Sequence, residues 1–354
     1  MTRRSRRTIF YLLVLVFALA APLTILYATG YSYDWENKRL LKTGAFYFRT
    51  IPKKTEVSIN GIKSDTAPGL IERLLPGEYE IEISKEGYQP WKKKLEINSQ
   101  LVTEARDVFL VPEKPKINLT SLETTTSSLL IFLSFEQRNA FDLASTTMSK
   151  LPGVSAWTNS GDKIYYLQNS SIAYQADLDG RNKKQISLEP LPETKAGWRL
   201  IAKNSRLAAL APDVGLFLLG REEIFEIISN KTQGAQFSPD AKKMLYWSDH
   251  EVWAMWLEEN LIQPPRKAGD KELITRLAKK IKQAAWFEET GEHIFLAVEG
   301  DNGNSDIKLI ELDRRDYRNI YDIFSAPSSE IFYSDKDKLL YIQNDLKLYS
   351  LDIF

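Results

Sequence analysis

One apolar stretch near the N-terminus constrains this chain more than any other feature. Residues 9–28 read IFYLLVLVFALAAPLTILYA and contain no charged side chain. A helix of about 20 residues, rising about 1.5 Å per residue, matches the roughly 30 Å hydrocarbon core of a bilayer. The stretch therefore predicts a transmembrane signal-anchor helix over residues 9–29, with the lipid bilayer as its partner through Ile9–Ala28.

The charges beside this stretch predict its orientation. Four arginines precede it, at Arg3, Arg4, Arg6 and Arg7. Positive charge stays on the cytoplasmic side of a membrane segment, so residues 1–8 are expected to be a cytoplasmic basic tail. The chain is then a single-pass protein of the cell membrane, with its C-terminal domains extracytoplasmic. Because a hydrophobic span directly follows the arginines, we do not expect nucleic acid to be a partner.

A cleaved signal peptide is the alternative for the same stretch. Ala18-Leu19-Ala20 has the small-x-small pattern of a signal peptidase site. The apolar run continues eight residues beyond Ala20, however, and cleavage there would leave it without a place to be buried. Aromatic residues suited to lipid headgroups lie at the end of the run and just beyond it, at Tyr27, Tyr31, Tyr33 and Trp35. We favour the anchor, and both alternatives export the rest of the chain.

Composition describes the remainder as ordinary water-soluble protein. Of 354 residues, 43% are hydrophobic and 27% are charged, with 47 Lys+Arg against 47 Asp+Glu. Cysteine is absent and there are two histidines, so disulfides and Cys-ligated metals are excluded and a His-based metal site is unsupported. No Gly-rich phosphate loop, HExxH or GxSxG motif occurs. We predict no catalytic residue, metal site or cofactor, and no enzyme activity.

Residues 30–43 are expected to be a connector, and β patterning begins after them. Asn60-Gly61 is typical of a two-residue type I′ turn, and Pro76-Gly77 marks another turn. Glu78–Ile83 alternates polar and apolar residues with the period of a strand. Residues 44–112 are therefore expected to form a small antiparallel β-sandwich.

The turns of this segment carry a family resemblance. The order Val57–Gly61, Thr66–Pro68, Leu75–Tyr79 and Lys85–Tyr88 resembles a PEGA domain. The resemblance implies a compact β-domain of envelope proteins that binds envelope or extracellular polymers, polysaccharide among them. The family's Pro-Glu-Gly-Ala stands here as Pro52-Lys53-Lys54-Thr55, which keeps only the proline.

Four aromatic residues are candidate ligand contacts, with packing in the core as the alternative for each. Tyr88 and Trp91 lie in the PEGA-like segment, where Trp91 precedes three lysines. Trp253 and Trp256 belong to a tryptophan cluster further along the chain. Exposed aromatic side chains concentrate at recognition surfaces, whereas buried ones stabilise a core.

Residues 115–354 repeat a strand–turn–strand unit. Ala156–Tyr166, Ala235–Tyr246, Ala285–Phe295 and Ile331–Tyr341 are copies, and Trp198–Ala209 is a degenerate fifth. A period of 40–50 residues is typical of β-propeller blades. Second strands are expected at 129–133, 164–167, 207–210, 244–247, 294–298 and 339–342, which gives about six blades.

The last blade lacks an outer strand of its own. We predict that Lys116–Leu119 supplies it and so removes two exposed sheet edges. Glu272–Lys280 is expected to be an outer strand rather than a helix, and Glu258–Asp270 a protruding functional loop.

The turns of these repeats resemble those of TolB-like and WD40-like propellers. Phe237-Ser238-Pro239-Asp240 fits three positions of the Ser-Pro-Asp-Gly turn, with Ala241 in place of glycine. That resemblance implies that Asp162, Asp240 and Asp337 form turns. The order of anchor, PEGA-like domain and propeller is similar to that of bacterial envelope proteins.

The predicted fold class is all-β apart from the N-terminal transmembrane helix. The predicted function is membrane-anchored, extracytoplasmic binding or scaffolding through the PEGA-like domain and the propeller. Its partner would be a protein or an envelope polymer such as polysaccharide. The alternatives are an envelope hydrolase, which needs two or three carboxylates converging in the propeller channel, and a mechanical spacer.

Overall fold

The computed structural model describes residues 3–121, 135–169, 171–287, 291–327, 330–334, 337–344 and 347–353. The chain divides into two compact units. The first contains Met1–Glu113 together with Arg314–Tyr317, and the second contains Lys114–Asp313 and Arg318–Ile353.

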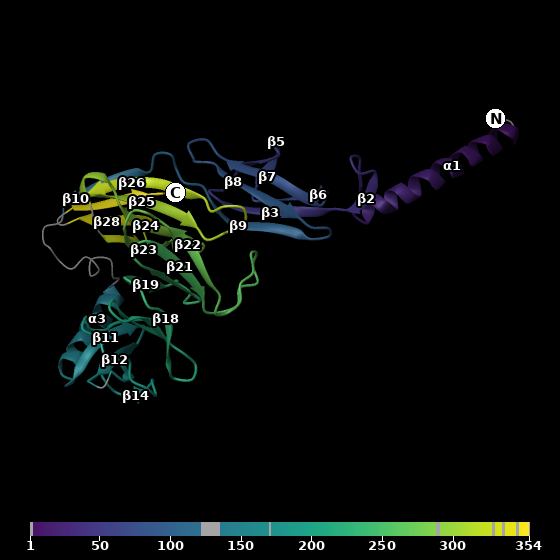
Figure 1. Ribbon diagram of the computed structural model, residues 1–354. Helices are drawn as coiled ribbons and strands as arrows, with labels where there is room; N and C mark the ends of the chain where they lie inside the picture. The colour runs from purple at the N-terminus through teal and green to yellow at the C-terminus, as the bar shows by residue number, and fades with distance from the viewer. Residues whose placement is uncertain are drawn as a thin grey trace. The chain divides into compact units, whose positions relative to one another are not determined.

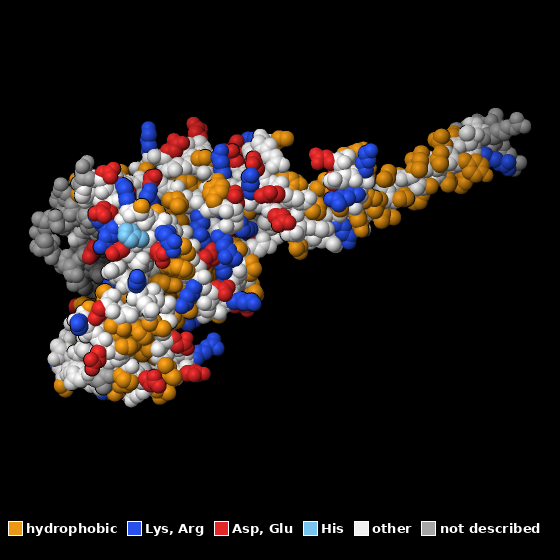
Figure 2. Space-filling model, viewed as in Figure 1, with side chains coloured by type: hydrophobic (Ala, Val, Ile, Leu, Met, Phe, Trp, Pro, Cys, Tyr) orange, Lys and Arg blue, Asp and Glu red, His pale blue; other side chains and the backbone are white. Residues whose placement is uncertain are grey.

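The first unit begins with the helix α1 (Arg3–Ala28), drawn in purple in Figure 1. Its Ser5–Ala28 portion is long and apolar enough to cross a membrane, and none of it is buried inside the protein. Apolar side chains cover its visible surface in Figure 2. Pro22 lies within the helix, a position that membrane helices tolerate. The predicted apolar helix is therefore present, whether it acts as anchor or as signal.

The expected connector has regular structure that the sequence analysis did not predict. Strands β1 (Tyr31–Asp34) and β2 (Arg39–Lys42) pair antiparallel directly after α1. Asp34 holds the turn between them, since its carboxylate accepts hydrogen bonds from the backbone N–H groups of Glu36 and Asn37, both at 3.1 Å. These bonds lower the pKa of Asp34, with the side-chain amide of Asn37 as the largest cause. The segment is thus a hairpin and not an open chain.

Two sheets pack face to face to form the small β-domain. One contains β6 (Gly69–Leu74), β3 (Gly44–Ile51) and β9 (Val102–Phe109); the other contains β5 (Ile62–Ala67), β4 (Thr55–Ile59), β7 (Gly77–Ser84) and β8 (Trp91–Ile97). Their shared core includes Phe46, Phe48, Ile83 and Trp91. One pairing differs from the expected antiparallel pattern, because β3 and β9 run parallel. No hairpin joins these two strands, so no turn imposes opposite directions on them.

The turns of this domain follow backbone requirements that the sequence only partly displays. Asn60 and Gly61 have φ of 50° and 77° and close the β4–β5 hairpin, which confirms the predicted turn. Lys54 occupies the position where the PEGA motif has glycine, and its φ is 60°. The left-handed conformation is therefore kept without the residue that adopts it most easily.

The second unit contains five four-stranded sheets, which are the blades of a β-propeller. In each blade the strands follow one another from the inner to the outer position in the order given. The first blade is β11 (Val154–Ser160), β12 (Lys163–Gln168), β13 (Ala173–Asp177) and β14 (Lys184–Gln185); the second is β15 (Arg199–Lys203), β16 (Arg206–Ala211), β17 (Gly215–Leu219) and β18 (Phe225–Ser229); the third is β19 (Gly234–Phe237), β20 (Lys243–Trp247), β21 (Glu251–Trp256) and β22 (Lys271–Arg276). The fourth is β23 (Ile281–Phe287), β24 (His293–Glu299), β25 (Asn304–Glu311) and β26 (Ile320–Pro327), with a 3₁₀ turn at Asp301–Gly303; the fifth is β27 (Glu330–Ser334), β28 (Leu339–Asn344), β29 (Lys347–Asp352) and β10 (Lys116–Ser121).

The described residues thus form five blades where the sequence analysis expects about six. The second strand expected at 129–133 lies outside the described residues, and the other five second strands are confirmed. The helix α3 (Phe135–Ser149) was not predicted. Ala144 and Met148 of this helix are buried against Ile164 and Tyr166 of the first blade. A strand-based repeat pattern gives no signal for such a covering helix.

In every blade, the described part of the first hairpin contains at least one residue with positive φ. The residues are Gly161, the pair Asn204 and Ser205, Ala241, Gly291 and Lys338, with φ between 45° and 66°. Around Ala241 the turn is held by polar contacts, because Ser238 Oγ donates to Asp240 Oδ1 at 2.6 Å and the N–H of Lys242 donates to the same oxygen at 3.0 Å. Burial alone would raise the pKa of Asp240, but these hydrogen bonds, together with the nearby charges of Lys243 and Lys242, outweigh it and lower the pKa. Asp240 is accordingly a turn-forming residue.

An N-terminal strand completes the last blade, as predicted. β10 pairs antiparallel with β29, with Ile117 opposite Leu351 and Asn118 opposite Ser350. The fifth blade is therefore assembled from chain segments more than 200 residues apart in the sequence. The Glu272–Lys280 segment begins as a strand, because β22 pairs with β21, and this also confirms the strand prediction.

Two glutamines join the inner strands of neighbouring blades. Gln283 Nε2 donates to the carbonyl of Ile331 at 3.0 Å, and the N–H of Ile331 donates to Gln283 Oε1 at 2.8 Å. Gln236 accepts two hydrogen bonds from Trp286, one at its side-chain Oε1 from the backbone N–H and one at its backbone carbonyl from the indole Nε1, both at 3.2 Å. The amide side chain of Gln283 offers both a donor and an acceptor, so it pairs with the neighbouring strand as another strand would.

Proline substitutions test the closing strand. In an antiparallel strand pair, the backbone N–H of every second residue points toward the paired strand. Asn118 and Leu119 are adjacent, so the N–H of only one of them bonds to β29. Proline has no N–H, so only one of Asn118→Pro and Leu119→Pro removes a hydrogen bond between β10 and β29. We expect that variant to lower the free energy of unfolding of the propeller by about 1–3 kcal/mol, and the other to have a much smaller effect. Both side chains are exposed, so little packing is lost. Urea unfolding of the full chain in detergent measures the difference, and equal unfolding of both variants and the parent would contradict the strand's role.

A second substitution tests the glutamine contacts between blades. Gln283→Leu leaves the N–H and the carbonyl of Ile331 without their partner, and we expect a loss of about 1–3 kcal/mol in the free energy of unfolding. Gln233→Leu is the matched control, because Gln233 is exposed and its side chain has no hydrogen bond among the described residues. If Gln283→Leu and Gln233→Leu unfold at the same urea concentration, the hydrogen bonds between Gln283 and Ile331 do not stabilise the propeller.

Candidate functional site

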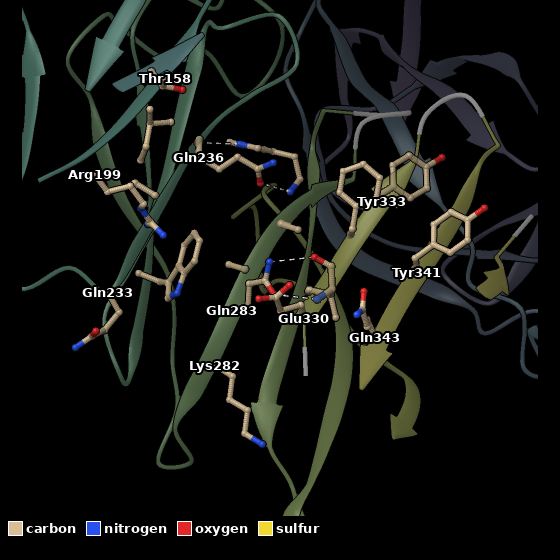
Figure 3. A pocket seen from close by; sticks show the side chains of 18 of the residues that line it. Thr158, Arg199, Gln233, Gln236, Lys282, Gln283, Glu330, Tyr333, Tyr341 and Gln343 are labelled. Atoms are coloured by element: carbon tan, nitrogen blue, oxygen red, sulfur yellow. Dashed lines mark hydrogen bonds between the residues drawn. The ribbon is translucent and has the colours of Figure 1, made fainter. Parts of the chain in front are cut away.

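The inner strands of the five blades surround a cavity of about 650 Å³. Each of these strands contributes to its lining, from Thr158 of β11 to Tyr333 of β27. Figure 3 shows Thr158 and Arg199 on one side of the cavity and Tyr333 and Tyr341 on the other. Concave sites of this size, with mixed apolar and polar walls, are where proteins bind ligands.

Arg199 is the most distinctive group in this lining. It is the first residue of β15, and its side chain extends toward the middle of the cavity (Figure 3). Among the described residues, no carboxylate forms an ion pair with it. Its side chain stays accessible to water in the cavity, yet the protein around it removes part of its hydration and lowers its pKa from the usual arginine value. The result is a cation whose charge is only partly compensated by its surroundings.

The remaining charges do not neutralise this cation locally. Lys282 is a second cation of the lining, and its Nζ donates to the carbonyl of Asn304 at 3.4 Å. Glu330 is the single carboxylate among the described lining residues. Two cations and one anion give the cavity a positive balance.

The described lining does not contain the carboxylate pair of a glycosidase. A glycosidase requires two carboxylates facing one another across the scissile bond, whereas the described wall has one. Among the described residues, no group of three or more His, Asp or Glu side chains is placed to hold a metal ion.

The predicted contact residues of the small domain lie elsewhere. Trp91 is 1% exposed and belongs to the core between the two sheets. Tyr88 is half-buried against the same core, with Lys85 Nζ 5.7 Å from its ring centroid. A ligand would reach Tyr88 at the domain surface and Trp91 only after displacement of core side chains. Their role in ligand contact stays a prediction.

The predicted contact residues of the third blade point in opposite directions. Trp256 is 3% exposed and packs beside Arg266, whose guanidinium lies 5.0 Å from its ring centroid. Trp253 is half-buried and stacks on Tyr246, with ring centroids 6.4 Å apart. Trp253 lines a second, smaller cavity of about 470 Å³. Burial raises the pKa of Tyr246 to about 12, so its hydroxyl stays protonated at neutral pH. Ligand contact by Trp253 and Trp256 also remains a prediction.

The expected functional loop, residues 258–270, is fixed by a buried ion pair. Arg266 Nε and Nη2 donate to Glu272 Oε2 at 3.0 and 2.7 Å, and Arg318 pairs with the other oxygen of Glu272. Leu261 near the middle of the loop is nonetheless exposed. The loop is therefore anchored at its base, which is common in loops that carry binding residues.

Sequence reasoning missed Arg199. Thr158 and Arg199 each follow a tryptophan and both line the cavity. The residue after Trp286, however, is Phe287, which is buried and is not part of the lining. The aromatic residues of the repeats therefore do not mark one inward-facing position.

Comparisons with known proteins address the two domains separately. The model of the PEGA domain family matches residues 43–110. A search of curated proteins found no match to the sequence.

Solved structures with similar folds share little sequence with the chain. An auxiliary nutrient binding protein from Bacteroides thetaiotaomicron aligns with 10% identity, covering 84% of this chain and 78% of its own, at a TM-score of 0.33. YCF48 from Cyanidioschyzon merolae aligns with 11% identity over 85% of this chain and 96% of its own, at a TM-score of 0.40. A gluconolactonase from Xanthomonas campestris aligns with 10% identity over 54% of this chain and 69% of its own, at a TM-score of 0.35. The chain thus carries a PEGA domain at residues 43–110, followed by a C-terminal β-propeller.

Proposed function

We propose that the protein is a membrane-anchored, extracytoplasmic binding or scaffolding protein whose propeller cavity receives an anionic segment of its partner. The observation that carries this proposal is Arg199, a cation without a carboxylate partner among the described residues, at the wall of a cavity of about 650 Å³. The PEGA domain and the apolar N-terminal helix support the envelope setting.

The electrostatics favour an anion over a neutral ligand. Arg199 loses hydration without gaining a counter-charge, so a ligand carboxylate or phosphate would restore the lost interaction. Thr158 and Gln233 add hydroxyl and amide groups that make no side-chain hydrogen bonds among the described residues. Aromatic rings of Tyr333 and Tyr341 provide apolar walls opposite the cation (Figure 3).

The same anionic chemistry has two sources in an envelope, an acidic glycan and an acidic peptide. Both present carboxylates along a chain, and both reach a cavity lined by inner strands. We therefore define the ligand by its charge and let the experiment separate the sources.

The test compares binding to charged and neutral probes. We expect the full chain in nanodiscs to bind oligogalacturonate or oligoglutamate, as measured by calorimetry, and to bind neither oligogalactose nor oligoglutamine. Arg199→Ala removes a charge-assisted hydrogen bond of about 1.5–3 kcal/mol, so the Kd should rise roughly ten- to a hundredfold.

Lys203→Ala is the matched control, because Lys203 lies in the same strand, carries the same charge and does not line the cavity. Its Kd should equal that of the parent. Equal weakening by both variants would show that general charge, rather than the cavity, attracts the probes. Failure of both acidic probes to bind would overturn the proposed ligand class.

The proposed topology has a test of its own. We infer that α1 remains attached, with Ser5 cytoplasmic and the propeller outside. Because the chain has no cysteine, Ser5→Cys and Leu261→Cys each introduce a unique label site. On intact cells a membrane-impermeant maleimide should label Leu261→Cys and spare Ser5→Cys, which it should label only after lysis. Loss of the Ser5→Cys label from lysed membranes would instead indicate cleavage.

A further inference from the structure

The β1–β2 hairpin presents one face rich in aromatic and apolar side chains. Tyr31 and Tyr33 alternate along β1, and their cross-strand partners on β2 are Lys42 and Leu40. Trp35 packs edge-on against Tyr33 with ring centroids 4.7 Å apart. These five residues, Tyr31, Tyr33, Trp35, Leu40 and Lys42, are called the aromatic face below.

This face is unusually open to solvent for its composition. Trp35 is 82% exposed, Leu40 49% and Tyr33 39%. Lys42 Nζ lies 5.5 Å from the ring centroid of Tyr31, so the face also carries positive charge. Solvent exposure of a tryptophan, a tyrosine and a leucine on one hairpin has no stabilising effect in water.

Hydrogen bonds fix the hairpin to the elements on both sides of it. Thr43 N and Oγ1 each donate to the carbonyl of Gly30 at 2.9 Å, which closes the hairpin at the end of α1. The N–H of Gln100, in the PEGA domain, donates to the carbonyl of Thr43 at 3.0 Å, and Lys42 Nζ donates to Gln100 Oε1 at 3.0 Å.

A second contact joins the PEGA domain directly to the helix end. Arg73 Nη2 donates to the carbonyl of Tyr27 at 2.6 Å, and its guanidinium stacks 3.3 Å from the centroid of the Tyr27 ring. Arg73 thereby satisfies a carbonyl in the last turn of α1 and supplies positive charge where the helix dipole is negative. The hairpin and the domain are thus held at the helix end and do not hang on a loose linker.

The hairpin begins directly after the end of α1. α1 ends at Ala28 and β1 begins at Tyr31, so the start of the hairpin lies within about 11 Å of the helix end at about 3.5 Å per residue. Tryptophan, tyrosine and lysine are the residues that favour the headgroup region, where an apolar body and a polar tip are both satisfied.

We propose that the aromatic face binds the headgroup region of the outer leaflet of the bilayer that α1 enters. The proposal rests on the membrane anchoring proposed above and adds a second contact to it. The exposed rings then occupy the interface between acyl chains and water, and Lys42 meets lipid phosphates. The PEGA domain is consequently held at the membrane surface, with its distance from the bilayer set by the hairpin.

Depth-dependent quenching tests this contact. Because the chain lacks cysteine, Leu40→Cys places a single bimane label on the aromatic face of the full chain. The protein is reconstituted into vesicles of phosphatidylcholine, with and without phosphatidylglycerol, that contain lipids spin-labelled near the headgroup. We expect at least threefold stronger quenching at Leu40→Cys than at Ile62→Cys, a site that is 73% exposed on the β4–β5 hairpin of the PEGA domain.

Lipid composition and a second variant show whether the aromatic rings or the charge of Lys42 cause the quenching. Quenching in both vesicle types shows that the rings bind the interface, and quenching only with phosphatidylglycerol shows that Lys42 and lipid charge are required; either supports the contact. Trp35→Ser in the Leu40→Cys background should reduce quenching at least twofold. An unchanged thermal unfolding midpoint would confirm that the fold is intact, as expected for so exposed a side chain.

A label within α1 distinguishes the two ways in which the proposal fails. If Leu15→Cys is quenched by spin labels deep in the acyl chains but Leu40→Cys matches Ile62→Cys, the helix is embedded and the aromatic face does not touch lipid. If Leu15→Cys is not quenched either, the proposed membrane anchoring is wrong. The proposed contact of the aromatic face with lipid is then wrong as well.

Discussion

The propeller depends on the pairing of β10 with β29. A blade that ends on an unpaired strand exposes a row of N–H and carbonyl groups, which is costly in solvent and prone to aggregation. Residues 116–121 satisfy that row in the fifth blade. This pairing joins the start of the repeat region to its end, so the last blade and the segment after the PEGA domain must form together. The Gln236 and Gln283 contacts then hold neighbouring inner strands at the cavity.

Backbone conformation explains why the repeats and the PEGA motif diverge in sequence but not in shape. The first hairpin of each blade has at least one left-handed residue among those described, and Asn204, Ser205, Ala241 and Lys338 adopt that conformation although glycine would do so with less strain. Lys54 does the same in the turn where the PEGA motif has glycine. Neighbouring hydrogen bonds, such as those around Asp240, hold such turns in place. Motif matching by residue type therefore understates the structural similarity.

The candidate binding features arise where the fold leaves groups incompletely satisfied. Arg199 faces a cavity without a paired carboxylate among the described residues. The aromatic face exposes Trp35 and Leu40 close to the end of α1. In the hairpin, strand alternation turns Tyr31 and Tyr33 to the same surface. Trp91 and Trp256, by contrast, face protein cores.

The sequence by itself determined the apolar helix, the PEGA domain, the propeller class, five of its second strands and the source of its closing strand. The helix, strands and turns follow from local periodicity, turn chemistry and the length of an apolar run. The PEGA and propeller classes follow from the resemblance of the turn motifs and repeats to those families. Only the tertiary structure decided the parallel pairing of β3 with β9, the helix α3, the hairpin after α1 and the convergence of Thr158, Arg199 and Tyr333 on one cavity. These depend on contacts between residues far apart in the chain, and no local pattern records which inward-facing side chains share a space.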